Sequence, residues 1–217
     1  MEQGSEEWKL AKCGWVGASR VADIIAKTKS GYSASRAKYM GQLITERLTG
    51  KPMETYSSAA MDWGVLTEAD ARAAYQFETT TLVAKTGFVR HPTIQLAGAS
   101  PDGLVGDAGL LELKCPDTHT HIETLLGQSV PGKYITQMQF QMACTGRGWC
   151  DFGSFDPRLP ESMQLWVQRV ERNDETIAEL EKEVRAFLGE LDAKLDLLCK
   201  KYGAKVVTFG DGLEKAA

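Results

Sequence analysis

The sequence lacks the features of membrane, secreted and repeat proteins. It has no apolar run near the roughly 20 residues that a membrane span needs, and its start lacks the basic-then-apolar pattern of a secretion signal. Its five cysteines are an odd number without CxxC spacing, which favours buried, reduced thiols over zinc ligands or disulfides. Internal repeats and low-complexity segments are absent. We therefore expect a cytosolic protein with no membrane partner.

Composition indicates an ordinary globular protein with an uneven charge distribution. The 217 residues, 43% hydrophobic and 25% charged, suit one domain over 1–217. The net charge of −4 argues against binding to nucleic acid. However, the stretch from Lys9 to Lys51 carries nine basic residues against two acidic ones, or +7, while the residues from Glu171 onward carry an acidic excess. We expect the amino-terminal part to face phosphates if any part does.

The hydrophobic patterns predict an α/β protein, α+β by strict count, with a central mixed sheet flanked by helices. A period of two predicts a short antiparallel meander over residues 79–98 as the core sheet, and Lys27 to Tyr32 is expected to be a polar, basic loop. A long amphipathic helix over 173–199 is expected to pack on this domain or on a neighbouring subunit. Helical spacing predicts further helices over residues 5–13, 17–25, 33–49, 59–78 and 133–145.

Two of these predictions concern side chains outside the strands. The helix over 59–78 is expected to turn an apolar face inward. His119 and His121 lie two residues apart without a third metal ligand nearby, so we expect both at the surface. The expected inward face of the helix consists of Trp63, Leu66, Ala69, Ala73 and either Phe77 or Tyr75.

Two acids and one lysine occur where two short strands are expected to pair. Strands at 104–105 and 110–111 are joined by the turn 106–109, which places Asp102 beside Glu112. Lys114 lies two residues after Glu112 and so points the same way. Two carboxylates suit a hard cation such as Mg²⁺, and the lysine could position or deprotonate water. Because two unfilled acids repel each other, replacing either should not destabilise the metal-free protein.

The alternative to a metal site for this motif is a solvated strand edge with a surface ion pair. The apolar residues around Asp102 and Glu112 favour burial, and buried carboxylates need a cation or hydrogen-bond partners. Tyr134, Gln137 and Gln141 fall on one face of the helix over 133–145, either towards solvent or towards this site. Near the amino terminus, the small residues before Ser19 predict either an anion site or an ordinary helix cap.

Several short motifs occur in one order and at matching intervals along nearly the whole chain. They are Trp8, Gly17-Ala18-Ser19, Trp63-Gly64 with Glu68, Ser100-Pro101-Asp102-Gly103, Leu111-Glu112-Leu113-Lys114-Cys115-Pro116, Tyr134 to Gln137, and Phe155-Asp156-Pro157-Arg158. In this order they resemble the phage lambda exonuclease family of viral recombination nucleases, a branch of the PD-(D/E)xK superfamily.

The resemblance implies a role for each matching residue. It makes Asp102, Glu112 and the Leu113 carbonyl metal ligands, Lys114 the residue that handles water, and Glu68 a ligand completing a second metal site. Ser19 and Ser100 match residues that hold a 5′ phosphate, and Lys12 stands where the family has an arginine, which keeps the charge without the bidentate geometry. The remaining matches are Met61, an apolar wedge at the DNA end, and Tyr134 and Gln137, active-site residues near the metal.

The same resemblance implies a Mg²⁺-dependent exonuclease with two metal ions, which Mn²⁺ can replace. It would digest linear duplex DNA from 5′ to 3′ and leave 3′ single strands for recombination. A ring-shaped homotrimer, a single-strand annealing recombinase partner and a phage or prophage origin, acting in the host cytoplasm, are further implications. The alternatives are an endonuclease or structure-specific nuclease on the same motif, and a DNA-binding recombination scaffold with a vestigial site.

Overall fold

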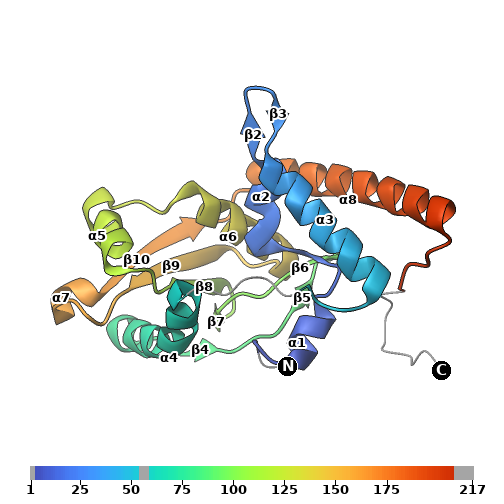
Figure 1. The fold of residues 1–217 in the computed structure, drawn as a ribbon. Helices are drawn as coiled ribbons and strands as arrows, with labels where there is room; N and C mark the ends of the chain where they lie inside the picture. Colours follow the sequence, from blue (N-terminus) through green and yellow to red (C-terminus); the bar gives the residue numbers. More distant parts are fainter. Residues whose placement is uncertain (1–2, 54–58, 208–217) are drawn as a thin grey trace.

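The computed structural model describes residues 3–53 and 59–207, without the side chains of residues 60 and 61. Helices flank strands throughout this part of the chain, an α+β fold as predicted (Figure 1). The helices are α1 (Glu6–Ala11), the 3₁₀ turn η1 (Ala18–Arg20), α2 (Val21–Ile25), α3 (Ala34–Thr49), α4 (Ala59–Thr79), α5 (Thr118–Gly127), α6 (Gly132–Thr145), α7 (Glu161–Gln164) and α8 (Asp174–Tyr202). The strands are β1 (Val16–Gly17), β2 (Lys27–Thr28), β3 (Gly31–Tyr32), β4 (Val83–Ala84), β5 (Val89–Arg90), β6 (Ala97–Ala99), β7 (Gly103–Val105), β8 (Gly109–Lys114), β9 (Trp149–Phe155) and β10 (Leu165–Glu171).

The central sheet has the strand order β10-β9-β8-β7-β4. Strands β8 and β9 are parallel and the other neighbours are antiparallel, so the sheet is mixed, as predicted. The parallel pair needs a crossover, which α5 and α6 supply. At the start of β8, Gly109 lies against the ring of Trp149, where a Cβ would come within 2.1 Å of a ring carbon. Only glycine lets the two strands approach this closely.

A second, smaller sheet contains β1, β6 and β5. Strand β1 is parallel to β6, and β5 is antiparallel to it. The meander predicted over residues 79–98 is confirmed for the antiparallel pair of β5 and β6, but it is wrong for β4, which joins the central sheet while β5 and β6 form the other one. Strand β6 is fully buried, so its backbone needs partners on both edges, and β1 supplies the second one from far along the chain.

The two faces of the central sheet pack on different helices. Leu111 and Leu113 pack with Tyr75 of α4. Leu110 and Phe152 pack on the opposite face, with residues of α6 such as Met138. Since side chains alternate along a strand, Glu112 points towards α6.

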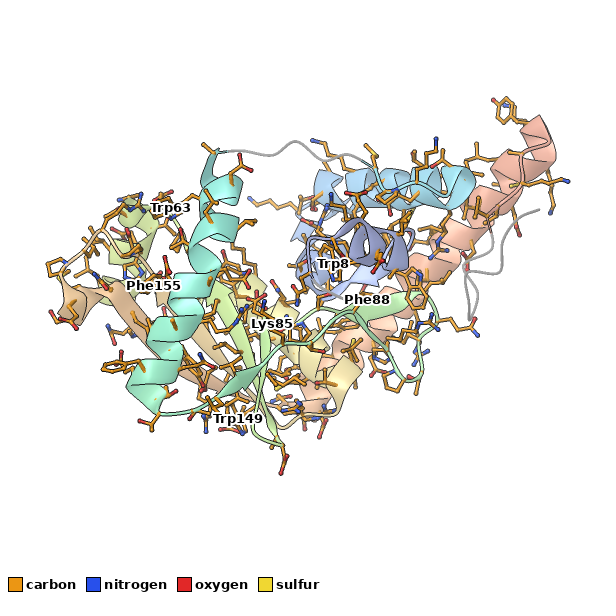
Figure 2. The ribbon with its side chains drawn as sticks, turned by 90° about the horizontal axis from the view of Figure 1, so that it is seen from below. Trp8, Trp63, Lys85, Phe88, Trp149 and Phe155 are labelled. Atoms are coloured by element: carbon orange, nitrogen blue, oxygen red, sulfur yellow. The ribbon has the colours of Figure 1, made fainter. Side chains whose placement is uncertain are left out.

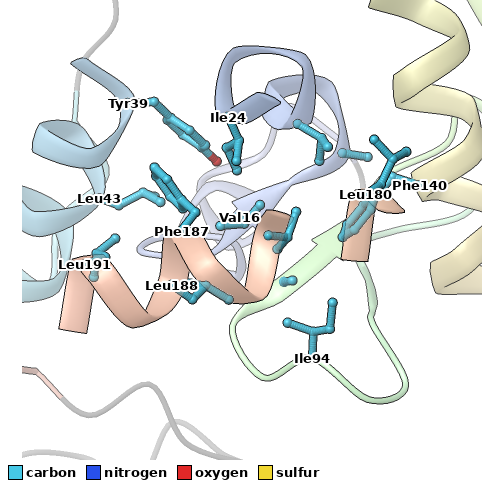
Figure 3. Close-up of a cluster of buried hydrophobic side chains, with 14 of the residues drawn as sticks. Val16, Ile24, Tyr39, Leu43, Ile94, Phe140, Leu180, Phe187, Leu188 and Leu191 are labelled. Carbon is cyan, nitrogen blue, oxygen red and sulfur yellow. The ribbon is translucent and has the colours of Figure 1, made fainter. Parts of the chain in front are cut away.

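Helix α8 packs on its own chain, against α2, α3 and α6 (Figure 3). It begins at an Asn173 cap, whose side chain accepts a hydrogen bond from the Thr176 N–H at 2.8 Å. The predicted apolar seam is buried from Ile177 to Leu195. At its centre, the ring of Phe187 stacks on Tyr39 of α3 with 5.8 Å between centroids. Burying a ring of this size stabilises the fold by about 1.5–3 kcal/mol.

The predicted inward face of α4 is wrong for Leu66 and for its two alanines, and of its two alternatives Tyr75 is buried and Phe77 is not. Thr67, Ala71 and Tyr75 are buried, whereas Leu66 is 78% and Phe77 is 87% exposed. The Tyr75 hydroxyl donates to Asp151 Oδ2 at 2.8 Å, so its polar atom is satisfied inside the protein. Ranking residues by hydrophobicity overlooks burial of this kind, because it depends on a partner that lies on β9.

Two predictions about local polar segments are also corrected. Residues 27–32 form the β2–β3 hairpin rather than a loop, and the Tyr32 hydroxyl holds this hairpin to α8 by donating to Glu183 at 2.7 Å. His121 is buried rather than at the surface, with Nδ1 at 2.7 Å from Ser154 Oγ and Nε2 at 2.8 Å from the Met163 carbonyl. His119 is exposed, as predicted.

Acids of α8 neutralise part of the charge of the basic amino-terminal stretch. Arg36 pairs with Glu190 at 2.6 Å, and Arg47 pairs with Asp192 at 2.8 Å. Both arginine side chains are buried, so neither offers its charge to DNA. The expectation that this whole stretch faces phosphates is therefore wrong for its two buried arginines.

The described residues confirm the expected state of the cysteines. All five carry free thiols, and four of the five are buried. None of the helices in the ranges that the structure describes is both long and apolar enough to cross a membrane.

Candidate active site

Asp102 and Glu112 meet where β7 begins beside β8. The Asp102 N–H donates to the Leu111 carbonyl at 3.1 Å, which extends the antiparallel ladder by one residue. Asp102 Oδ2 then accepts the Leu113 N–H at 2.7 Å. Because residues 111 and 113 are two apart on one strand, their backbone groups point to the same side, and the Leu113 carbonyl faces the Asp102 side.

Glu112 is fully buried and accepts hydrogen bonds from three side chains. Gln137 Nε2 donates to its Oε1 at 2.7 Å, and Gln141 Nε2 donates to its Oε2 at 2.6 Å. The ammonium group of Lys114 also contacts Oε1. The two glutamines lie one turn apart on α6, so one helix face holds the carboxylate.

The electrostatics of the cluster follow from burial and crowding. Burial raises the pKa of Asp102 well above its usual range, and the nearby charges of Glu112 and Glu68 add to this rise. Burial lowers the pKa of Lys114, but the charges of Glu112 and Asp102 outweigh burial and leave this pKa above its usual value. Lys114 is therefore protonated and supplies one positive charge next to the two acids.

The residues present fit a hard divalent cation. Two carboxylates and the Leu113 carbonyl provide the oxygen ligands that Mg²⁺ prefers. The raised pKa of Asp102 indicates two acids that lack sufficient positive charge, which a cation would supply. Among the described residues, no three His, Cys, Asp or Glu side chains gather closely enough to hold a metal by themselves. The ligand set thus depends on the backbone carbonyl or on a movement of Glu68.

Glu68 lies on α4, close enough to raise the pKa of Asp102. Its Oε1 is 2.5 Å from Arg72 NH2, one turn along the helix. Arg72 NH2 also lies 3.3 Å from the Asp102 carbonyl. Arg72 therefore holds the Glu68 side chain near the two acids, with the Glu68 carboxylate in an ion pair. To bind a second metal ion, Glu68 would have to leave this ion pair with Arg72.

Tyr134 completes the side of the site next to α6. Its ring centroid lies 5.3 Å from Lys114 Nζ and 5.3 Å from the ring of Phe152, on which it stacks. The aromatic face thus covers the ammonium group on one side and the sheet on the other.

The predicted phosphate-binding residues gather next to the acids. Trp8 Nε1 donates to Ser100 Oγ at 2.9 Å, and Lys12 Nζ lies 3.3 Å from the centroid of the Trp8 ring. Burial, opposed by the charge of Glu46, lowers the pKa of Lys12 to about 8. Trp8 therefore joins Lys12 and Ser100 in one cluster among the amino-terminal elements (Figure 2).

Ser19 approaches the same region by another route. It is exposed on η1, which packs against β6 just before Ser100. The alternative that Ser19 caps α2 is wrong, because the cap position is Arg20 and no side chain bonds the helix end there.

The segment that follows Lys114 is tied down by Asp156. Its carboxylate accepts from Arg158 Nε at 2.7 Å and from the Thr118 hydroxyl at 2.6 Å. Burial raises the pKa of Asp156, but these hydrogen bonds outweigh it and lower the pKa to about 2. Arg158 in turn lies over the ring of Trp63, a residue of α4 that Figure 2 labels. Met61 belongs to the same helix, but its side chain lies outside the described residues.

The structure adds residues that the sequence did not assign to the site. The sequence leaves open whether Gln141 faces solvent or the site, and its contact with Glu112 shows that it faces the site. Trp8 and Arg72 had no assigned role. Their signal in the sequence was weak, since a tryptophan near a helix start and an arginine on a charged helix are both common.

Comparison with known proteins gives a consistent picture. The family model described as the YqaJ-like viral recombinase domain matches residues 7–148. The chain is similar to an alkaline exonuclease (LHK-Exo) from Laribacter hongkongensis, with 52% identity and a TM-score of 0.86 over 92% of this chain and 98% of that chain. LHK-Exo in complex with dAMP matches with 53% identity, the same TM-score and the same coverage. A phage-related exonuclease from Haemophilus somnus 129PT shares the fold, with a TM-score of 0.70 and 15% identity over 85% of this chain and 96% of that chain. No curated protein matches the chain.

Proposed function

Because this chain belongs to the YqaJ-like viral recombinase domain family and is a deoxyribonuclease, we propose that it digests one strand of linear duplex DNA from the 5′ end. The product would be a 3′ single-stranded overhang for homologous recombination, taken up by a single-strand annealing partner. The observation that carries this proposal is the cluster of the buried Glu112 with the partly buried Asp102 and Lys114, beside the Lys12–Trp8–Ser100 group. One group suits phosphodiester hydrolysis, and the other suits a terminal phosphate.

Asp102, Glu112 and the Leu113 carbonyl would hold a divalent cation, with Mg²⁺ as the expected ion and Mn²⁺ as its substitute. When bound, the cation lowers the pKa of water and stabilises charge on phosphate oxygens. A second Mg²⁺ would recruit Glu68 from Arg72. In the metal-free protein the charges of the two acids hold the pKa of Lys114 above its usual value. We propose that Lys114 orients water by donating a hydrogen bond, rather than removing a proton.

We propose that Lys12, Ser19 and Ser100 receive the 5′ phosphate. Lys12 supplies positive charge from a half-buried position, where a salt bridge is less screened than at the open surface. The Ser100 hydroxyl accepts from Trp8 and keeps its own hydrogen to donate. Ser19 is exposed and available on the neighbouring turn. The Met61 wedge remains a prediction from the family resemblance.

The proposal is tested by digesting linear duplexes labelled at the 5′ or the 3′ end, beside closed circles, with Mg²⁺ present. We expect early release of the 5′ label, retention of the 3′ label and intact circles. Asp102→Asn should be inactive, whereas Asp107→Asn, a matched change at the exposed tip of the same hairpin, should keep its activity. Early release of the 3′ label contradicts the polarity, and cut circles indicate an endonuclease. DNA binding without any cleavage indicates the scaffold.

We also propose that the working form is a homotrimer that encloses the duplex. The pairing of Arg36 and Arg47 with α8 removes part of the electrostatic reason for a ring. An exposed apolar face of α4 supplies a different one, since Leu66 is 78% and Phe77 is 87% exposed on the same side of this helix. Apolar surface gathered in this way marks an interaction site. In a ring, each copy would present this face to the next copy.

A further inference from the structure

Gln141 reaches the catalytic acid from a position that neither DNA nor solvent can enter. It is 0% exposed, and its Nε2 lies 2.6 Å from Glu112 Oε2. Its own Oε1 has no hydrogen-bond partner among the described residues. A buried amide that leaves one end unpaired requires an explanation. Turning the amide over would bring two oxygens together, so the contact with Glu112 fixes its orientation.

The hydrogen bonds around Glu112 leave its two oxygens unequal. A carboxylate has about four lone-pair directions, two on each oxygen. Oε1 uses both of its directions, for Gln137 and Lys114, while Oε2 uses one, for Gln141. The remaining direction is on Oε2. A cation that bound both oxygens at once would also have to displace a donor from Oε1.

We propose that Gln141 is a positioning residue that fixes the plane of the Glu112 carboxylate, so that it offers a single oxygen to the cation. This inference rests on the proposed metal-dependent function and deepens it. Mg²⁺ and Mn²⁺ accept single oxygens in octahedral geometry, whereas Ca²⁺ takes more ligands and readily accepts a bidentate carboxylate. Holding Glu112 in one plane therefore favours Mg²⁺ over Ca²⁺.

The test measures the affinity of the DNA-free protein for Mg²⁺ and, separately, for Ca²⁺ by calorimetry. Gln141→Met keeps the length of the side chain and removes the donor. We expect its Mg²⁺ affinity to fall about tenfold, the lower end of the range for residues that orient metal ligands. Its Ca²⁺ affinity should fall less, because the Glu112 carboxylate can then turn out of the plane that Gln141 fixed, and Ca²⁺ tolerates an altered ligand geometry better than Mg²⁺ does. The ratio of the two affinities is the readout, since a general loss of structure lowers both alike.

Gln139→Met is the matched control. Gln139 is a buried glutamine of the same helix, but it donates to the Glu171 carbonyl at 2.7 Å instead of to Glu112. Its ratio should equal that of the wild type. If Gln141→Met does not fold, Gln141→Asn keeps a buried amide that is too short to reach Glu112.

An unchanged ratio in the folded variant, or the same shift in Gln139→Met, overturns the role of Gln141 while leaving the proposed function intact. A wild-type protein that binds neither cation overturns both.

Discussion

The two acids of the active site should respond differently to the loss of their charge. Asp102→Asn and Glu112→Gln are isosteric changes, and in the metal-free protein they remove different interactions. Asp102 holds one backbone N–H and is forced towards its neutral form by burial and crowding. An asparagine oxygen can accept the same hydrogen bond. We therefore expect Asp102→Asn to change the free energy of unfolding by less than about 1 kcal/mol in either direction.

Glu112→Gln removes the charge that three donors share. Its new amide would set N–H groups against those of Gln141 or Gln137, and Lys114 would lose its nearest counter-charge. Breaking a buried ion pair from one side costs about 3–5 kcal/mol. The Lys114 side chain is 29% exposed, so we expect the lower part of that range. The expectation that removing either acid spares stability is thus revised for Glu112.

The measurement is thermal and urea unfolding of both variants in excess chelator at neutral pH. For a chain of 217 residues, each kcal/mol shifts the melting temperature by roughly 2–4 °C. Glu112→Gln should therefore melt about 6–12 °C below the wild type, whereas Asp102→Asn should stay close to it. Equal melting temperatures for the two variants would falsify the idea that Glu112 organises its three donors. A large loss in Asp102→Asn would instead make Asp102 a structural acid.

Three further predictions address the lysines and the helix face. Lys114→Ala should lower the cleavage rate by about 10²–10⁴-fold. It should bind Mg²⁺ as well as the wild type or better, because a competing cation is gone. A loss of Mg²⁺ affinity as large as that of Asp102→Ala refutes this prediction. Because the pKa of Lys12 is lowered to about 8, it loses its charge above that pH, so the preference for 5′-phosphorylated over 5′-hydroxyl ends should weaken as pH rises from 7 to 9, and it should be small at every pH in Lys12→Ala. A preference that does not change with pH excludes Lys12 from the pocket. The double change Leu66→Ser and Phe77→Ser should lower the mass measured by light scattering to that of one chain, and it should shorten the DNA tracts digested when competitor DNA is present. The control Leu197→Ser, which changes an exposed leucine on α8, should do neither. An unchanged mass in the double variant means that the interface lies elsewhere, and a single-chain mass for the wild type contradicts the ring.

Sequence reasoning succeeded where the signal was local. The apolar seam of α8 and the turn between β7 and β8 are set by residues close together in the chain, and each was predicted at its place. The same applies to Asp102 and Glu112, because a tight turn leaves a two-strand pairing little freedom of register. The helix over 133–145 was predicted by its spacing as well.

Prediction failed where a polar atom finds its partner far along the chain. Tyr75 is buried because Asp151 accepts its hydroxyl hydrogen, and His121 is buried because Ser154 and the Met163 carbonyl satisfy both ring nitrogens. The energy of burying such a group changes by about 1–3 kcal/mol according to whether that partner is present. A hydrophobicity pattern has no access to this difference. It therefore left Phe77 and Tyr75 as alternatives for the inward position and placed His121 outside, whereas the structure buries Tyr75 and His121 and exposes Phe77.

The same reasoning explains why the active site was the most predictable polar part of the molecule. Its acids lie on paired strands, so their separation is fixed by backbone geometry rather than by distant partners. The surrounding amides of Gln137 and Gln141 reach the acids from α6, whose position depends on the whole crossover between β8 and β9. The placement of the two acids that we propose as metal ligands therefore follows from a short stretch of sequence. The orientation of Glu112, and with it the proposed choice of cation, depends on the complete fold.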